Sequence, residues 1–91
     1  MDLYTKNGKP LQVSGDIVYS KSGVAFGKIR GSKVFGTDGR YVGTIVNDRL
    51  VYRAADSASV GSPFSVANRI GSAKANRAGA AIMGEEPRIP N

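Results

Sequence analysis

The sequence predicts a mainly β fold, in which about four hairpins of roughly 16 residues form a flower-like or barrel-like meander. Three observations favour it. Aliphatic–aromatic pairs recur at nearly constant spacing, a glycine follows most of these pairs four residues after the aromatic, and turn-forming residues recur about every eight residues. Such turn spacing is typical of short antiparallel strands. One C-terminal helix, rich in small residues, is expected after the hairpins.

The repeat is clearest in the aromatic residues. Tyr4, Tyr19, Phe35 and Tyr52 each follow an aliphatic residue, and they stand 15, 16 and 17 residues apart. A glycine stands four residues after each of the first three, whereas Asp56 takes that place in the fourth. Terminal repeats are often atypical, so this departure is compatible with a fourth unit. The four aromatic side chains either fill the core, which is the commoner role in strands, or form a platform for a ligand.

Two sets of turns alternate along the repeats. Asn7-Gly8 and Asp38-Gly39 favour two-residue type I′ turns, and Ser22-Gly23 stands at the equivalent place. Second turns are expected at residues 14–16, 31–32 and 47–48. The strands between these turns are predicted at residues 2–5, 10–13, 17–20, 25–30, 33–36, 41–46 and 49–53. Gly27 and Gly43 fall inside strands, which indicates that another group approaches the backbone closely there.

The composition changes near Asp56, so we expect a hairpin-repeat domain at residues 1–56 and a different segment at residues 57–91. From Phe64 to Met83 small residues fall at helical spacing on one stripe, and Ser62-Pro63 is a suitable helix start. This pattern predicts a loop, a helix up to about residue 83 and an extended end, all packed on the β domain. The alternative is a disordered basic tail that folds on a partner.

The repeated Tyr-x-x-x-Gly hairpins of residues 3–53 resemble the four-fold β-flower domain, a small bacterial family. The motif is carried by Tyr4/Gly8, Tyr19/Gly23 and Phe35/Gly39/Gly43, and Tyr52 opens a fourth unit without its glycine. The resemblance implies four similar hairpins around a pseudo-four-fold axis. The family carries no assigned activity, so the resemblance implies a fold and no function.

Charge and composition narrow the possible partners and compartment. Thirteen Lys and Arg residues against seven Asp and Glu give a net charge of +6, which suits either an anionic partner or ordinary solubility. The basic residues are spread along the chain, which makes nucleic acid a weaker candidate than a protein or small ligand. The chain has no cysteine, which fits a reducing cytoplasm, and no apolar stretch long enough to cross a bilayer.

Enzymatic chemistry is disfavoured by the residues that the chain lacks. Without His or Cys it has neither the commonest general base and metal ligand nor a thiol nucleophile. Asp16, Asp38 and Asp48 lie at predicted turns, where short acidic side chains cap backbone groups. We therefore expect no catalytic residue, no cofactor and no metal site.

The expected function is a non-enzymatic binding or structural module for a protein or a small molecule. The alternative is an anion-binding module for nucleic acid or an acidic lipid surface. That module would use basic residues on repeated outward positions, namely Lys21, Lys28, Arg30, Lys33, Arg40 and Arg53. The candidate ligand-binding residues are the repeated aromatics and three of these cations: Tyr4, Tyr19, Phe35, Tyr52, Lys28, Arg30 and Arg40. The sequence leaves the oligomeric state open.

Overall fold

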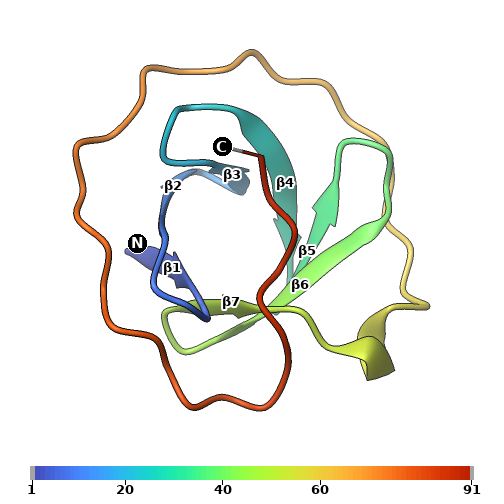
Figure 1. Cartoon of the computed structure of the whole chain (residues 1–91). Coiled ribbons are helices and arrows are strands. Elements are labelled where there is room, and N and C mark those ends of the chain that lie inside the picture. The colour runs from blue at the N-terminus through green and yellow to red at the C-terminus, as the bar shows by residue number, and fades with distance from the viewer. Residues whose placement is uncertain (1, 91) are drawn as a thin grey trace.

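The computed structural model describes residues 2–90, which form a closed β-barrel of seven strands (Figure 1). The strands are β1 (Leu3–Thr5), β2 (Pro10–Ser14), β3 (Ile17–Tyr19), β4 (Ala25–Arg30), β5 (Lys33–Gly36), β6 (Tyr41–Val46) and β7 (Arg49–Val51). Each strand pairs with the next in antiparallel fashion. The predicted mainly β fold is confirmed, and the seven predicted strands coincide with the observed ones to within about two residues at each end.

The barrel closes through a parallel pair between β1 and β7, with Tyr4 opposite Arg49. Successive strands of a meander alternate in direction, so the first and the seventh run the same way. A fourth hairpin is not completed in residues 2–90. After β7 the chain makes a 3₁₀ turn, η1 (Ala54–Asp56), and leaves the barrel. Asp56 occupies the place of the turn glycine and accepts a hydrogen bond of 2.7 Å from Thr44 Oγ1, which ties η1 to β6.

The barrel interior is filled by aliphatic side chains and one phenylalanine. This core consists of Leu3, Leu11, Val18, Phe26, Val34 and Leu50. A Cβ atom on Gly43 would lie 2.9 Å from Leu50 Cδ1, and one on Gly27 would collide with Val34 Cγ1. The two strand glycines are therefore required because larger side chains would overfill the narrow interior, in agreement with the close approach that their positions predict.

The turns at one end of the barrel differ from the prediction. We call this end, formed by residues 5–9, 20–24, 36–40 and 53–56, the mouth. Gly8, Gly23 and Gly39 have φ values of +96°, +97° and +82°, but the residues before them do not have positive φ. Each glycine N–H donates to the carbonyl three residues earlier. These loops therefore have three residues, with glycine in the left-handed region, and the predicted two-residue type I′ assignment is wrong.

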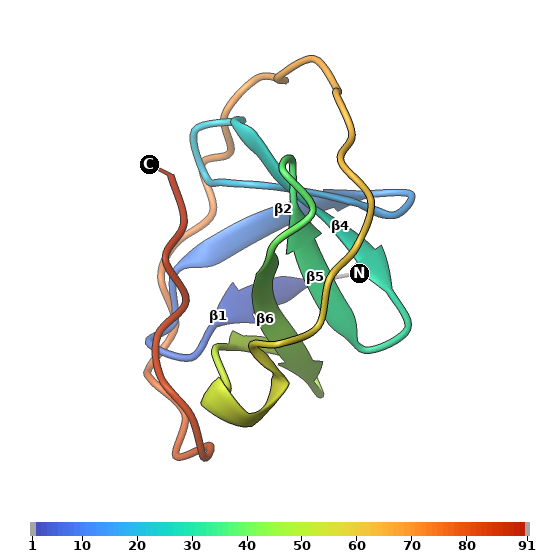
Figure 2. The ribbon, with the colours of Figure 1, turned by 90° about the vertical axis from the view of Figure 1, so that its right-hand side faces the viewer.

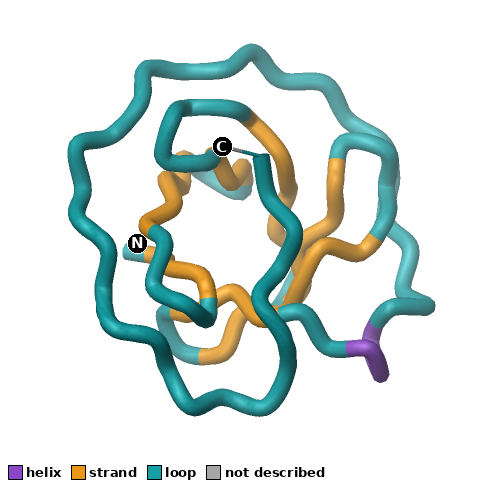
Figure 3. The backbone as a smooth tube through the Cα atoms, in the orientation of Figure 1, coloured by secondary structure: helices purple, strands orange, loops and turns teal. Residues whose placement is uncertain are grey.

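The helix predicted from residue 62 to residue 83 is absent, and these residues form an irregular extended segment instead (Figure 3). Residues 61–83, which we call the belt, run around the outside of the barrel (Figures 1 and 2). Belt amides meet the mouth glycines in reverse order. The N–H of Gly61 donates to Gly39, that of Arg69 to Gly23 and that of Arg77 to Gly8, at 2.7, 2.8 and 2.9 Å.

Contacts between the belt and the mouth turns recur every eight residues and not at the spacing of a helix. Gly61, Arg69 and Arg77 stand eight residues apart and contact successive turns. The belt lies so close to the turns that a Cβ atom on Gly8 would collide with the carbonyl of Arg77. Small residues in the belt allow this close approach. Their spacing also fits one stripe of a helix, which is why the sequence predicts a helix there. Over residues 2–90 there is no helix with the length and hydropathy needed to cross a membrane.

Residues 85–90, which we call the strap, cross the mouth of the barrel (Figure 1). Glu85 and Tyr52 exchange two backbone hydrogen bonds of 2.8 Å each. The Glu86 carboxylate accepts hydrogen bonds from Thr5 Oγ1 at 2.7 Å and from the Asn7 N–H at 2.9 Å. Ile89 packs against the core. The strap therefore closes the mouth through both polar and apolar contacts.

The contact between belt and turns can be tested by comparing two glycines. Gly8→Ala places a side chain on a residue with positive φ, which strains the backbone, and also makes its Cβ collide with the belt. Gly31→Ala causes backbone strain alone, because Gly31 has a φ of +62° and no atom lies within 4 Å of the added Cβ. We expect Gly31→Ala to lower the free energy of unfolding by about 1 kcal/mol and Gly8→Ala by about 2–4 kcal/mol. Chemical denaturation measures both, and hydrogen exchange at the Arg77 amide should accelerate only in Gly8→Ala. Equal destabilisation would contradict the belt contact.

Candidate functional site

Three of the four repeated aromatic residues lie between the barrel wall and the belt. Tyr4, Tyr19 and Phe35 are 6%, 8% and 7% exposed, and Tyr52 is half-buried. Each follows a buried aliphatic residue, so its ring lies on the outer face of the strand. The belt covers the first three rings: Gly61 lies against Phe35, the Arg69 guanidinium lies 5.3 Å from the centre of the Tyr19 ring, and Arg77 lies over Tyr4. In this arrangement the protein's own chain occupies the aromatic faces.

The Tyr4 ring has the densest set of cations around it. Arg77, Lys74 and Arg49 place their charged groups 4.4, 4.8 and 5.9 Å from the ring centre. Two carboxylates lie beside these three cations: Arg77 and Arg49 lie 2.7 and 3.6 Å from Asp48, and Lys74 lies 3.0 Å from Asp2. This cluster therefore anchors the belt by cation–π and ionic contacts, and the two aspartates balance most of its positive charge.

Of the three basic residues of the predicted site, Lys28 and Arg30 stand two residues apart on one face of β4, and Arg40 lies in the β5–β6 turn. Lys28 lies 3.8 Å from Asp16, and Arg40 lies 3.6 Å from Asp38. Arg30 is exposed at the end of β4. Two of the three thus face a carboxylate of a nearby turn.

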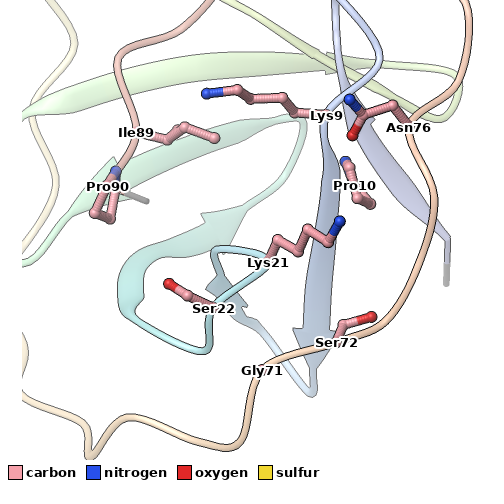
Figure 4. Close-up of a pocket in the computed structure, with 9 residues that line it drawn as sticks. All are labelled: Lys9, Pro10, Lys21, Ser22, Gly71, Ser72, Asn76, Ile89 and Pro90. Carbon is pink, nitrogen blue, oxygen red and sulfur yellow. The ribbon is translucent and has the colours of Figure 1, made fainter.

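A cavity of about 410 Å³ lies at the mouth, where the barrel, the belt and the strap meet (Figure 4). Its volume lies within the range of small-molecule sites, about 300–1,000 Å³. The barrel contributes two turns, and the belt and strap contribute the remaining walls. The lining residues are Lys9, Pro10, Lys21, Ser22, Gly71, Ser72, Asn76, Ile89 and Pro90.

The cavity combines an apolar body with a cationic rim. Pro10, Ile89 and Pro90 supply the apolar surface. The Lys21 side chain extends from the β3–β4 turn toward Pro10, and the Lys9 side chain extends toward Ile89 (Figure 4). Neither ammonium group has an ion-pair or hydrogen-bond partner within residues 2–90. No carboxylate is present among the described residues that line the cavity.

A second cavity, of about 450 Å³, also uses the strap as a wall. It is lined by Tyr41, Val42, Tyr52, Glu85, Glu86 and Arg88. The Tyr41 and Tyr52 rings lie 5.5 Å apart at an interplanar angle of 50°. Tyr52 is thus the one residue of the predicted set that lines either of these two cavities. Glu86 is already engaged by Thr5 and Asn7, so this cavity is built around a structural contact of the strap.

Most residues of the mouth cavity escaped the sequence analysis. Lys21 was among the cations considered for anion binding, but Lys9, Asn76 and Ile89 carried no local signal. One pattern in the sequence could have indicated that the belt contacts the turns, namely the eight-residue spacing of Gly61, Arg69, Arg77 and Glu85. Once the belt is placed on the turns, the position of the strap can be inferred as well.

Comparisons of the chain with family models, curated proteins and solved structures found no match. The geometry of the cavities is therefore the basis for inferring a function.

The belt contact beside Tyr4 predicts a measurable titration. The Lys74 ammonium donates a hydrogen bond to Asp2 and adds its positive charge, and both effects lower the pKa of Asp2 below its ordinary value. We expect Lys74→Met to raise the Asp2 pKa, as followed by the carboxyl carbon NMR shift, whereas Lys28→Met should leave it unchanged. A lowered folded-state pKa means that the ionised carboxylate favours folding above the ordinary aspartate pKa, and that this contribution is lost as the pH falls through the lowered pKa. An Asp2 titration indifferent to Lys74 would contradict the contact.

Proposed function

We propose that this chain is a non-enzymatic binding module that takes a small molecule with an apolar body into the mouth cavity. One observation carries the proposal: a cavity of about 410 Å³ whose walls come from the barrel turns, the belt and the strap. Sites that combine apolar walls with a few polar groups in this size range are the usual places for small ligands. Burial of the ligand's apolar surface would supply most of the binding free energy.

Binding is favoured over catalysis by the chemistry of the lining. The cavity offers lysine, serine and amide groups, without His, Cys or a carboxylate among its described residues. General acid–base catalysis usually needs a His or a carboxylic acid close to the reacting atoms. Nucleic acid is less favoured as a partner, because Lys28 and Arg40 each lie near an aspartate.

The proposal includes the four-fold hairpin architecture of the β-flower family. Its support is a hydrogen bond that recurs at all four turns: the N–H groups of Gly8, Gly23, Gly39 and Asp56 each donate to the carbonyl three residues earlier. The fourth unit keeps this bond while losing its second strand. Four equivalent turns around one end of a barrel would give the belt and strap a ring of similar docking positions, from which the cavity walls are built.

The test is a titration of the full chain with decanol, an uncharged probe with a linear apolar body, followed by amide NMR shifts. We expect saturable shifts confined to the lining residues, with Lys21, Ser72 and Ile89 among them. Asn76→Trp should fill the cavity and weaken binding at least about tenfold, equivalent to 1.4 kcal/mol. Ala75→Trp, at an exposed neighbouring position that does not line the cavity, is the matched control and should retain the affinity.

Absence of saturable decanol binding would refute the proposal. Shifts centred on the exposed apolar residues Ile70 and Met83 would also refute it, because they would place the probe on the outer face of the belt.

A further inference from the structure

We propose that the ligand of the mouth cavity is a single-chain amphiphile with an anionic headgroup, a carboxylate or a phosphate, and that Lys9 and Lys21 bind this headgroup. The inference rests on the proposed function, since it names the ligand class of the same cavity. It goes further by assigning a charge to the ligand and a role to two side chains.

First, the rim of the cavity holds two cations without a counter-charge. Within residues 2–90 the cations that lie within 4 Å of a carboxylate are Lys28, Arg40, Arg49, Lys74 and Arg77, and the other lysines and arginines have no such partner. Lys9 and Lys21 have no such partner within residues 2–90, although both line the cavity. Two cations beside an apolar surface create a positive potential that attracts an anion and repels a cation.

The second argument is the placement of the two lysines. Lys9 follows the β1–β2 turn, and Lys21 lies in the β3–β4 turn. In Figure 4 the two side chains extend in different directions, Lys9 toward Ile89 and Lys21 toward Pro10, so that an anionic headgroup at either side of the cavity would lie near an ammonium group. Lysine stems pack on apolar groups while their charged ends stay at the surface, which suits a ligand whose chain is buried and whose headgroup remains at the rim.

The third argument concerns the remaining polar groups and the apolar wall. The Ser72 hydroxyl oxygen accepts a hydrogen bond of 3.0 Å from the Lys74 N–H, which leaves its proton available for an anionic oxygen. The Asn76 amide adds further donors at the rim. On the apolar side, Ile89 packs against the barrel core and thus continues the core surface into the cavity. The lining therefore separates into a donor-rich rim and an aliphatic interior.

The experiment compares three probes of equal chain length on the full chain: decanoate, decanol and decyltrimethylammonium, each below its micelle-forming concentration. We expect decanoate to bind at least about tenfold more tightly than decanol, and decyltrimethylammonium to bind most weakly. Lys9→Met and Lys21→Met, which keep an unbranched apolar stem, should each lower the ratio of decanoate to decanol affinity about fivefold, the upper end for an exposed ion pair. Rising salt should weaken decanoate alone.

Lys28→Met is the matched control, because it removes the same charge from β4, outside the cavity, and should leave this ratio unchanged. If decyl phosphate binds with the same dependence on Lys9 and Lys21 as decanoate does, this result supports recognition of an anionic headgroup of either kind. If inorganic phosphate binds as tightly as decyl phosphate, the apolar chain contributes nothing and the assignment of an amphiphilic ligand is wrong. The three lysine variants and Asn76→Trp are checked by their melting temperature before titration.

The results separate the two proposals. Equal binding of decanoate and decanol, insensitive to Lys9 and Lys21, overturns the charge assignment and leaves the cavity function standing. Failure of all three probes to bind overturns both proposals. Sedimentation with phosphatidylglycerol vesicles that persists in Asn76→Trp would also overturn the inference, because the cations would then serve a membrane surface and not a ligand in the cavity.

Discussion

Close contact between two stretches of backbone, the belt and the mouth turns, organises the rest of this molecule. Each turn glycine has positive φ, and at Gly8 and Gly23 the absence of a side chain also lets a belt carbonyl approach. Glycine thereby satisfies two requirements at these positions, the backbone conformation of the turn and the close approach of the belt. A barrel of residues 3–51 is small, and domains of this size bury little surface when alone. The belt extends the buried surface by covering Tyr4, Tyr19 and Phe35 on the outer face of the barrel.

The contact between the belt and the mouth turns also gives several positive charges their partners. The belt residues that meet the turns of Gly23 and Gly8 are Arg69 and Arg77, whose guanidinium groups lie over Tyr19 and Tyr4. Arg77 also meets Asp48, and the intervening Lys74 meets Asp2. Cations in the belt therefore have aromatic or acidic partners that come with the docking itself. Lys9 and Lys21 are different, because they lie at the turns but face the cavity, where the fold provides no partner within the described chain. Positive charges that are spread evenly along the sequence thus differ in their surroundings, since those of the belt have partners whereas Lys9 and Lys21 line a cavity.

The strap links the cavity to the stability of the fold. Glu86 holds it to Thr5 and Asn7, and Ile89 attaches it to the core. Since Ile89 and Pro90 are also cavity walls, the binding surface exists only while the strap is docked. A ligand that contacts them would favour the docked strap and so stabilise the folded chain by mass action. The chain that leaves the barrel after Asp56 becomes the belt and then the strap, so one continuous segment both covers the barrel and forms the cavity walls.

The sequence by itself determined the features that depend on neighbours along the chain. Strand positions followed from aliphatic–aromatic pairs and turn residues, and the need for Gly27 and Gly43 followed from their places inside strands. Turn type was decided by the pairing of the flanking strands: the Thr5 N–H donates to Lys9, which encloses three residues where Asn7-Gly8 alone favours two. Only the tertiary structure decided the course of residues 61–83, because small residues suit both a helical stripe and a close approach every eighth residue. The cavity was equally beyond local analysis, since Lys9, Lys21 and Ile89 come from distant segments that meet only when the belt and strap dock on the mouth.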